Sequence, residues 1–183
     1  SHSTFVGFGA GSAVTTAASN TIIGSHAGDA ITTGAKNVAI GHGSLGALTT
    51  TSGNVAIGYN AMDAGVDGVQ NCIAIGNDAL GALTASGSGT TPNIAIGYNA
   101  GAGMTTGTSN IAIGGWCMDA VVTGNSNVAI GANAMTALTS GGTNTAVGHG
   151  SGQAVTTGSN NTFFGSTSGD ALTTGSQNTF VGS

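Results

Sequence analysis

Charged side chains are nearly missing from this sequence of 183 residues, and basic ones almost entirely so. Lysine and arginine together number one, Lys36, while the six acidic residues are all aspartate and the net charge is −5 at pH 7. One basic residue can neutralise neither a phosphate backbone nor an acidic membrane surface. We therefore expect no binding to nucleic acid.

Long apolar runs and catalytic residue pairs are scarce as well. No stretch approaches the roughly 20 consecutive apolar residues that a membrane-spanning helix needs, so we expect no membrane insertion. Glutamate and arginine are absent and the aspartates are dispersed, which leaves no visible acid–base pair or activated nucleophile. The sequence thus predicts no enzyme, no catalytic residue, no cofactor and no metal site.

Glycine, by contrast, is abundant, with 35 residues. A unit of five residues recurs throughout: Asn, a β-branched residue, Ala or an aromatic, Ile or Val, then Gly, which we call the anchor glycine. The intervals between anchors are 17 residues, except for one of 18 and one of 21. The anchors are Gly7, Gly24, Gly41, Gly58, Gly76, Gly97, Gly114, Gly131, Gly148, Gly165 and Gly182.

A fixed period over the whole chain is typical of a solenoid. Seventeen residues are too few for two helices and a turn, so the period predicts an all-β fold, a β-solenoid of about 17 residues per coil. We expect one domain over residues 1–183, with 11 anchor repeats and two short strands in each coil. The two longer intervals predict loop insertions near residues 66–70 and 85–92.

Two rows within the anchor unit are typical of a β-strand, one of them apolar and the other β-branched. The residue before the anchor is Ile, Val or Phe, and the residue two positions earlier is Thr, Val or Ile. Because strand side chains alternate, both rows share one face, which we expect to line the coil interior. A third apolar row, seven residues after the anchor, is expected to close the interior from a second strand; it includes Val14, Ile31, Val121 and Leu172.

The residue between the first two rows is apolar too, being Ala, Ile or Phe. A sheet that is apolar on both faces is normally covered on both, and another copy of the chain is the simplest cover. Where this residue is large, the residue four positions after the anchor is glycine. Where it is alanine, that later position is mostly leucine or methionine, which indicates that the two side chains share one space. Two exceptions, Ala95 with Gly101 and Ala146 with Gly152, predict loose packing or a ligand gap.

Asparagine lies four residues before the anchor in nine of the eleven units. Stacked about 4.8 Å apart, such amides can hydrogen-bond along the whole column, so we interpret them as a structural ladder. These residues are Asn20, Asn37, Asn54, Asn93, Asn110, Asn127, Asn144, Asn161 and Asn178.

The repeat resembles two known groups of proteins. The unit at 37–41 (NVAIG), repeated at 54–58 and 127–131, resembles the signature of the head domains of trimeric autotransporter adhesins, although their repeat is shorter. The longer unit at 161–178 is similar to repeats of phage tail-fibre and related appendage proteins. The resemblance implies a left-handed parallel β-roll wound as a homotrimer. It also implies an extracellular place on a virion appendage or cell surface, and a structural or adhesive role in host or surface recognition.

Candidate binding residues come from the two insertions and from the aromatic residues at the same level. Insertions in solenoids often mark the binding face, and exposed rings are good platforms for sugars. The alternative for the rings is that they plug the axis or the corner of the coil. A cell-surface glycan or protein receptor would then meet Tyr59, Asp67, Gln70, Ser88, Thr90, Tyr98 and Trp116.

Two other functions remain open at this point. Paired threonines such as Thr32–Thr33 and Thr173–Thr174 recur and favour an ice-binding β-solenoid, although neighbouring side chains point to opposite faces and only one row could line a flat surface. No capping element is visible at the first or last unit, which favours an end-to-end homopolymer of an extracellular filament.

Overall fold

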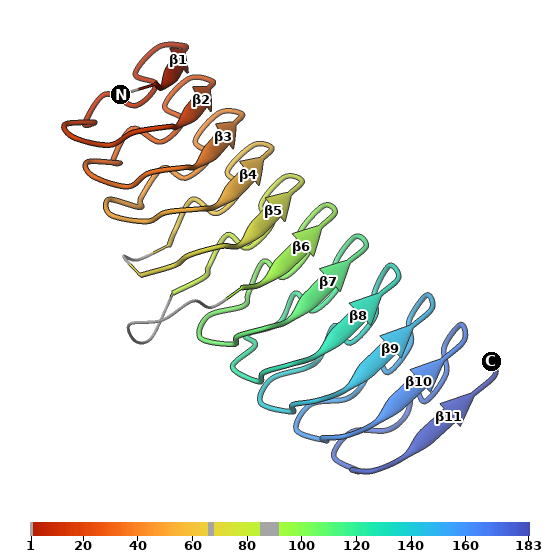
Figure 1. Cartoon of the computed structure of the whole chain (residues 1–183). Coiled ribbons are helices and arrows are strands. Elements are labelled where there is room, and N and C mark those ends of the chain that lie inside the picture. The colour runs from red at the N-terminus through yellow and green to blue at the C-terminus, as the bar shows by residue number, and fades with distance from the viewer. Residues whose placement is uncertain (1, 66–67, 85–91) are drawn as a thin grey trace.

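The computed structural model describes residues 2–65, 68–84 and 92–183 and confirms an all-β, parallel solenoid (Figure 1). Eleven strands of three residues form one parallel sheet in which each strand pairs with the next along the chain. They are β1 (Thr4–Val6), β2 (Thr21–Ile23), β3 (Val38–Ile40), β4 (Val55–Ile57), β5 (Ile73–Ile75), β6 (Ile94–Ile96), β7 (Ile111–Ile113), β8 (Val128–Ile130), β9 (Thr145–Val147), β10 (Thr162–Phe164) and β11 (Thr179–Val181). We number each coil by its strand.

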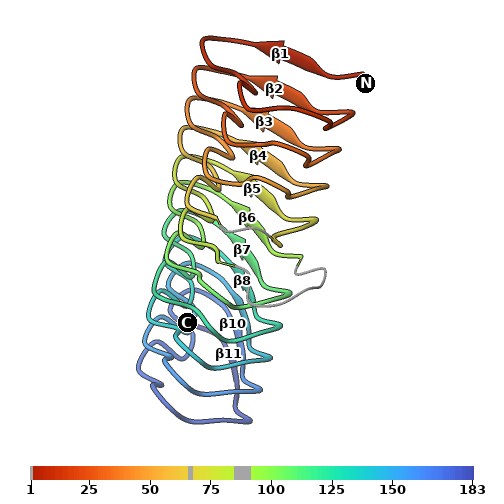
Figure 2. The ribbon, with the colours of Figure 1, turned by 90° about the vertical axis from the view of Figure 1, so that its left-hand side faces the viewer.

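Equivalent residues of successive coils stack in columns along the solenoid, as Figure 2 shows from the side. In β3 and β4, for example, Ala39 lies opposite Ala56. The anchor column needs glycine, because Gly41 has a φ of +127° and a Cβ there would overlap the carbonyl oxygen of Gly58. Within the described ranges no helix is long and apolar enough to cross a membrane. The predicted insertions fall largely on 66–67 and 85–91, outside the described residues.

The prediction of two strands per coil is wrong. Among residues 2–65, 68–84 and 92–183 each coil has one strand, and the described part of the opposite wall consists of successive turns. Residues two and four positions after the anchor have positive φ, as His26 (+55°) and Leu45 (+54°) show. Left-handed residues at alternate positions curl the backbone and prevent an extended strand.

The prediction of which sheet face lines the interior is also wrong. The middle residue of each strand points inward, so that Ala39 and Ala56 are fully buried, while the flanking rows point outward, with Val6 56% and Phe164 58% exposed. The interior is narrow because the turn wall approaches the sheet closely, and large side chains of that wall, such as Leu45, fill the space left by alanine. The middle row is apolar and the flanking rows hold only valine, isoleucine, phenylalanine and threonine, so alternation alone did not distinguish the two faces.

The predicted sharing of space between the middle strand residue and the fourth residue after the anchor is confirmed, inside the coil. A Cβ at Gly11 would lie 3.1 Å from the Phe5 ring, and one at Gly28 would lie 3.0 Å from Cδ1 of Ile22. Leu or Met takes the glycine position in most coils whose strand carries alanine, and Leu45 is one fully buried example. The coil interior therefore keeps its volume by exchanging bulk between its two walls.

The loose packing or ligand gap expected at the two exceptional coils does not occur. A Cβ at Gly101 would lie 3.0 Å from Leu80 and 3.4 Å from Met104. A Cβ at Gly152 would lie 2.9 Å from the Phe163 ring of the next coil. Side chains from neighbouring coils thus fill both spaces.

The third apolar row, seven residues after the anchor, lines the interior as predicted in most coils. Ile31, Leu48 and Leu138 are fully buried there. Coil 7 differs, because Val121 is 60% exposed and the next residue, Val122, is fully buried in its place. The turn of coil 7 is shifted by one residue along the sequence.

Candidate binding surfaces

The asparagine column lies inside the solenoid and holds the coils together. The Oδ1 atom of Asn20 accepts a hydrogen bond of 2.8 Å from the backbone N–H of Asn37, and the pattern continues along the stack. The amide of Asn37 donates to the carbonyl of Thr51 (2.9 Å), and that of Asn144 also donates to Oδ1 of Asn127 (3.1 Å). Apart from the partly buried Asn178, these side chains are almost inaccessible to a ligand.

The two cysteines are buried and free. Cys72 replaces asparagine in the column of coil 5, where its sulfur lies 3.4 Å from the backbone N of Asn93 and occupies the acceptor position. The Cys117 thiol donates to the carbonyl of Ala129 at 3.2 Å. Burial raises the pKa of Cys72 and raises that of Cys117 to about 12, so both are thiols at neutral pH and poor nucleophiles.

An aromatic column lines the turns that follow the first four strands, formed by Phe8, His26, His42 and Tyr59. The ring centroids are 5.4 Å apart for Phe8 and His26, and 6.1 Å apart for His26 and His42. His42 and Tyr59 are stacked at 5.2 Å with an interplanar angle of 12°. The sequence did not reveal that Phe8, His26 and His42 form one column, because Phe8 and His42 come one residue after their anchors whereas His26 comes two residues after its anchor.

A second aromatic group belongs to coils 6 and 7. The rings of Tyr98 and Trp116 meet edge to face at 5.2 Å. Tyr98 and Tyr59 are each 50% exposed and Trp116 is 48% exposed, so none of the three fills the coil corner. Half-exposed rings beside polar turn residues can pack against the apolar face of a ligand.

The structure does not bring the other predicted binding residues to these rings. Gln70 precedes β5 and forms an isolated parallel bridge with Ser52, whereas Tyr59 follows β4. Segments that enter the strands and turns that leave them line opposite edges of the stack (Figure 1). Asp67, Ser88 and Thr90 lie outside the described residues.

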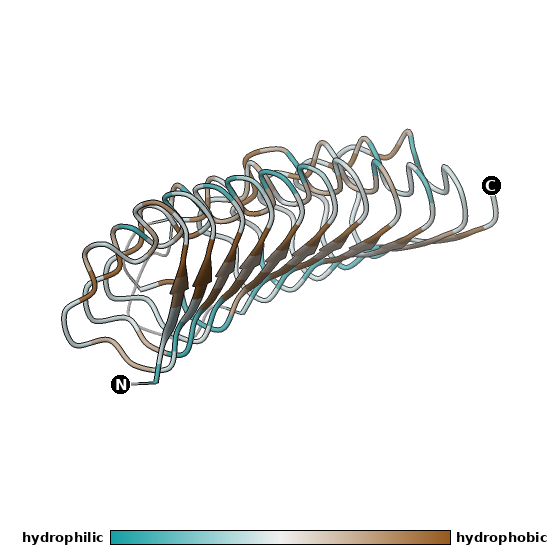
Figure 3. Cartoon of the chain, turned by 90° about the horizontal axis from the view of Figure 1, so that it is seen from above, coloured by the Kyte–Doolittle hydropathy of each residue, from teal (hydrophilic) through white to brown (hydrophobic). Residues whose placement is uncertain are grey.

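The outer sheet face is formed by the first and third residues of each strand, and Figure 3 shows these strands as an apolar band. In coils 3 to 8 both columns consist only of valine and isoleucine, and these side chains are partly exposed, with Ile130 at 38%. They are Val38, Ile40, Val55, Ile57, Ile73, Ile75, Ile94, Ile96, Ile111, Ile113, Val128 and Ile130.

The paired threonines form two rows along the solenoid, and the hydroxyls of the first row hydrogen-bond to the next coil. The hydroxyls of Thr15 and Thr156 donate to the backbone carbonyls of Thr32 (3.1 Å) and Thr173 (3.2 Å) in the next coil. The second residue of each pair is exposed in most coils, as Thr33 is. The first row is less exposed, although Thr15 and Thr173 are exposed as well.

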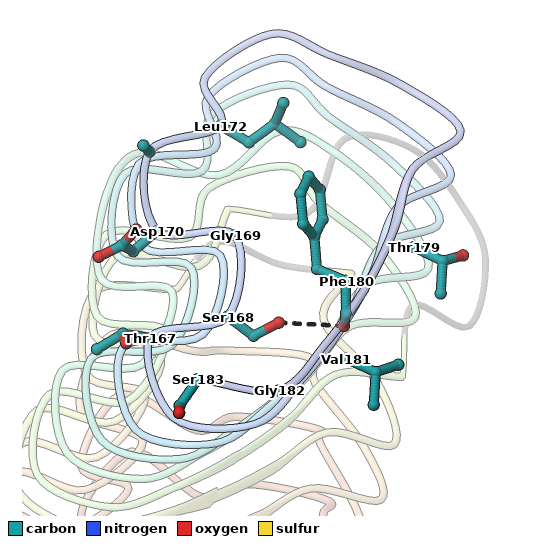
Figure 4. A pocket seen from close by; sticks show the side chains of 11 residues that line it. Thr167, Ser168, Gly169, Asp170, Leu172, Thr179, Phe180, Val181, Gly182 and Ser183 are labelled. Atoms are coloured by element: carbon teal, nitrogen blue, oxygen red, sulfur yellow. Dashed lines mark hydrogen bonds between the residues drawn. The ribbon is translucent and has the colours of Figure 1, made fainter.

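A pocket is formed by residues of coils 10 and 11 (Figure 4). Leu172 and Phe180 line it, and Phe180 is 37% exposed. Ser168 donates its hydroxyl to the Phe180 carbonyl at 3.1 Å, so this serine is part of the stacking pattern. Among the described residues, no three His, Cys, Asp or Glu side chains gather closely enough to hold a metal ion.

The chain matches no family model, no curated protein and no solved structure. The surfaces of the solenoid are therefore the basis for the functional proposal.

Proposed function

We propose that the chain is a non-enzymatic segment of an extracellular fibre, a phage tail fibre or a cell-surface adhesin, that assembles with copies of itself and presents side chains for host or surface recognition. One observation supports this proposal most directly. The outer sheet face is apolar through six successive coils, although the sheet already buries its other face in the coil interior. Parallel sheets of this kind are normally covered on both faces.

The size of the outer sheet face favours a long partner with the same repeat. Six strands about 4.8 Å apart extend roughly 24 Å along the solenoid axis from the first strand to the last. Burying a valine or isoleucine side chain contributes about 1.5–3 kcal/mol, so a partner that covers both columns gains substantially from these twelve residues. A second copy offers the same spacing, and closed rotational symmetry lets every copy bury its face. We propose the trimeric, left-handed β-roll that the resemblance implies.

Sedimentation at two protein concentrations tests the assembly. We expect about three times the chain mass of 17.2 kDa at both concentrations. Ile113→Lys, at the centre of the outer sheet face, should shift the mass towards the monomer while the far-UV circular dichroism stays unchanged. Val121→Lys is the matched control, because Val121 is exposed on the turn wall. A monomeric native protein would contradict the proposal.

Two other outcomes correspond to the alternative functions. A mass that grows with concentration would favour end-to-end stacking into a homopolymer, in which the open pocket beside Phe180 meets the next copy. Ice binding is favoured by the outward row that includes Thr33 and Thr157. Measuring ice-growth inhibition decides that alternative, and no inhibition at high protein concentration ends it.

A further inference from the structure

A gap separates the two aromatic groups at coil 5. The residue directly after the anchor is Tyr59 in coil 4, Asn77 in coil 5 and Tyr98 in coil 6. The three turns are in register, because the N–H of Asp78 donates to the Tyr59 carbonyl and the N–H of Asn99 donates to the Asn77 carbonyl, both at 3.0 Å. The two tyrosines thus occupy equivalent positions with a single asparagine between them.

Both tyrosine rings that border this gap are supported from the far side. His42 of coil 3 stacks on Tyr59, and Trp116 of coil 7 contacts Tyr98, each at 5.2 Å between ring centroids. Neither tyrosine has a ring neighbour in coil 5, where the exposed residue is Asn77. Rings held in place by neighbours lose little conformational freedom when a ligand binds, so the gap is a preorganised slot.

The dimensions of the slot fit one inserted ring. Two coil spacings of about 4.8 Å place the equivalent positions of Tyr59 and Tyr98 roughly 10 Å apart. Ring centroids in stacked contact are about 4.5–7 Å apart, so two such contacts add up to this separation. A single ring can therefore lie between the tyrosines and touch both, with the Asn77 amide beneath it.

We propose that this slot binds a sugar ring of a neutral glycan. A pyranose has apolar C–H faces that pack on aromatic rings, and it has hydroxyls that can exchange hydrogen bonds with the Asn77 amide and the Asp78 carboxylate. The chain has no arginine and a single lysine, Lys36, which precedes β3 at the opposite end of the strands, so neither residue type is at the slot to attract an acidic sugar. The neighbouring carboxylate of Asp78 disfavours one.

This inference rests on the proposed recognition role and specifies its ligand. It does not depend on how many copies assemble. The same samples can be measured for sugar binding and for mass, so that failure of one proposal is distinguishable from failure of the other. A monomer that binds sugar through the slot would contradict the proposed fibre assembly and support the sugar site.

The test uses the full chain with maltohexaose, cellohexaose and chitohexaose as neutral probes and sialyllactose as the acidic comparison. Trp116 is the only tryptophan and contacts Tyr98, so its fluorescence reports on the slot, and calorimetry measures the affinity independently. Asn77→Tyr should close the gap with the side chain that both neighbouring coils already accept. Ser166→Tyr places the same ring at the equivalent exposed position of coil 10 and is the matched control.

We expect at least one neutral probe to bind in the millimolar range or better, with a saturable change in Trp116 fluorescence. Asn77→Tyr should weaken that binding at least ~10-fold, about 1.4 kcal/mol, whereas Ser166→Tyr should leave it unchanged. No binding of any neutral probe overturns the inference. Binding that survives Asn77→Tyr, or that is as tight for sialyllactose, overturns it as well.

Discussion

Converting the interior of one coil into that of its neighbour tests how the solenoid core is packed. Coil 2 has a large strand residue, Ile22, opposite Gly28, whereas coil 3 has Ala39 opposite Leu45. The double variant Ile22→Ala/Gly28→Leu gives coil 2 the arrangement of coil 3. If the two positions share one space, the pair should be far less harmful than its members.

The contacts set the expected magnitudes. Ile22 is fully buried, so Ile22→Ala should lower the free energy of unfolding by about 2–5 kcal/mol. Gly28→Leu places a Cβ 3.0 Å from Cδ1 of both Ile22 and Ile31, at a φ of +50°. Overpacking costs about 1–3 kcal/mol and left-handed backbone about 1–2 kcal/mol. Independent effects would sum to about 4–10 kcal/mol in the double variant.

We expect a favourable coupling of about 2–3 kcal/mol instead, because the new leucine refills the space that isoleucine leaves. Urea unfolding followed by circular dichroism measures all four members of the cycle, provided that each unfolds in a single transition. Ile22→Ala combined with Leu138→Ala is the control, since these coils are distant and should behave additively. Additive losses in the coil 2 pair would refute the shared-space explanation.

Three further results are expected. Asn127→Ala leaves buried backbone groups of the next coil unpaired and should lower the free energy of urea unfolding by about 2–6 kcal/mol. Asn125→Ala removes only exposed hydrogen bonds, from the backbone N–H and the hydroxyl of Thr108, and should cost about 0.5–1.5 kcal/mol; equal losses would contradict the ladder. Burial, and then the charge of Asp78, raise the pKa of Asp63. The folded state therefore holds the Asp63 proton to higher pH than the unfolded state does. The resulting contribution to the free energy of unfolding is fully present below the ordinary pKa of 3.8 and is lost as pH rises through the raised pKa. Asp63→Asn should therefore raise the melting temperature at neutral pH but give no such gain below pH 3.8, and an equal gain at both would argue against this sign. The Cys117 thiol, with a pKa of about 12, should react with a thiol reagent only after unfolding in urea, and rapid labelling of the folded protein would disprove its burial.

Much of the architecture follows from the repeat alone. A constant interval of 17 residues forces each residue type into the same place in every coil, so columns result whatever the exact path of the chain. The asparagine column is visible in the spacing of Asn37 and Asn54. Coil 2 pairs the large Ile22 with Gly28, and coil 3 pairs the small Ala39 with Leu45. Packing at constant volume leaves such a compensating pattern in the sequence, so the pattern showed that the middle strand residue contacts the fourth residue after the anchor.

The candidate site was only partly visible in the sequence. Tyr59, Tyr98 and Trp116 stood out as aromatic residues near anchor glycines. They were grouped with the insertions because both occur in neighbouring coils, but the sequence did not show that they lie at different corners of those coils. His42 became part of the site only through its stacking on Tyr59. Ring contacts between coils depend on the backbone path of each turn, which the residue types do not specify.

Tertiary structure alone decided which side of the sheet became the interior. Val38 and Ala39 are both apolar, and alternation places them on opposite faces without saying which face is buried. The decision depends on how closely the opposite wall can approach. Alanine on the strand lets Leu45 reach the interior, and this burial holds a leucine in left-handed backbone that its own propensity disfavours. The sequence by itself thus determined the period and the columns, while packing between the walls determined inside from outside and replaced the second strand with a turn.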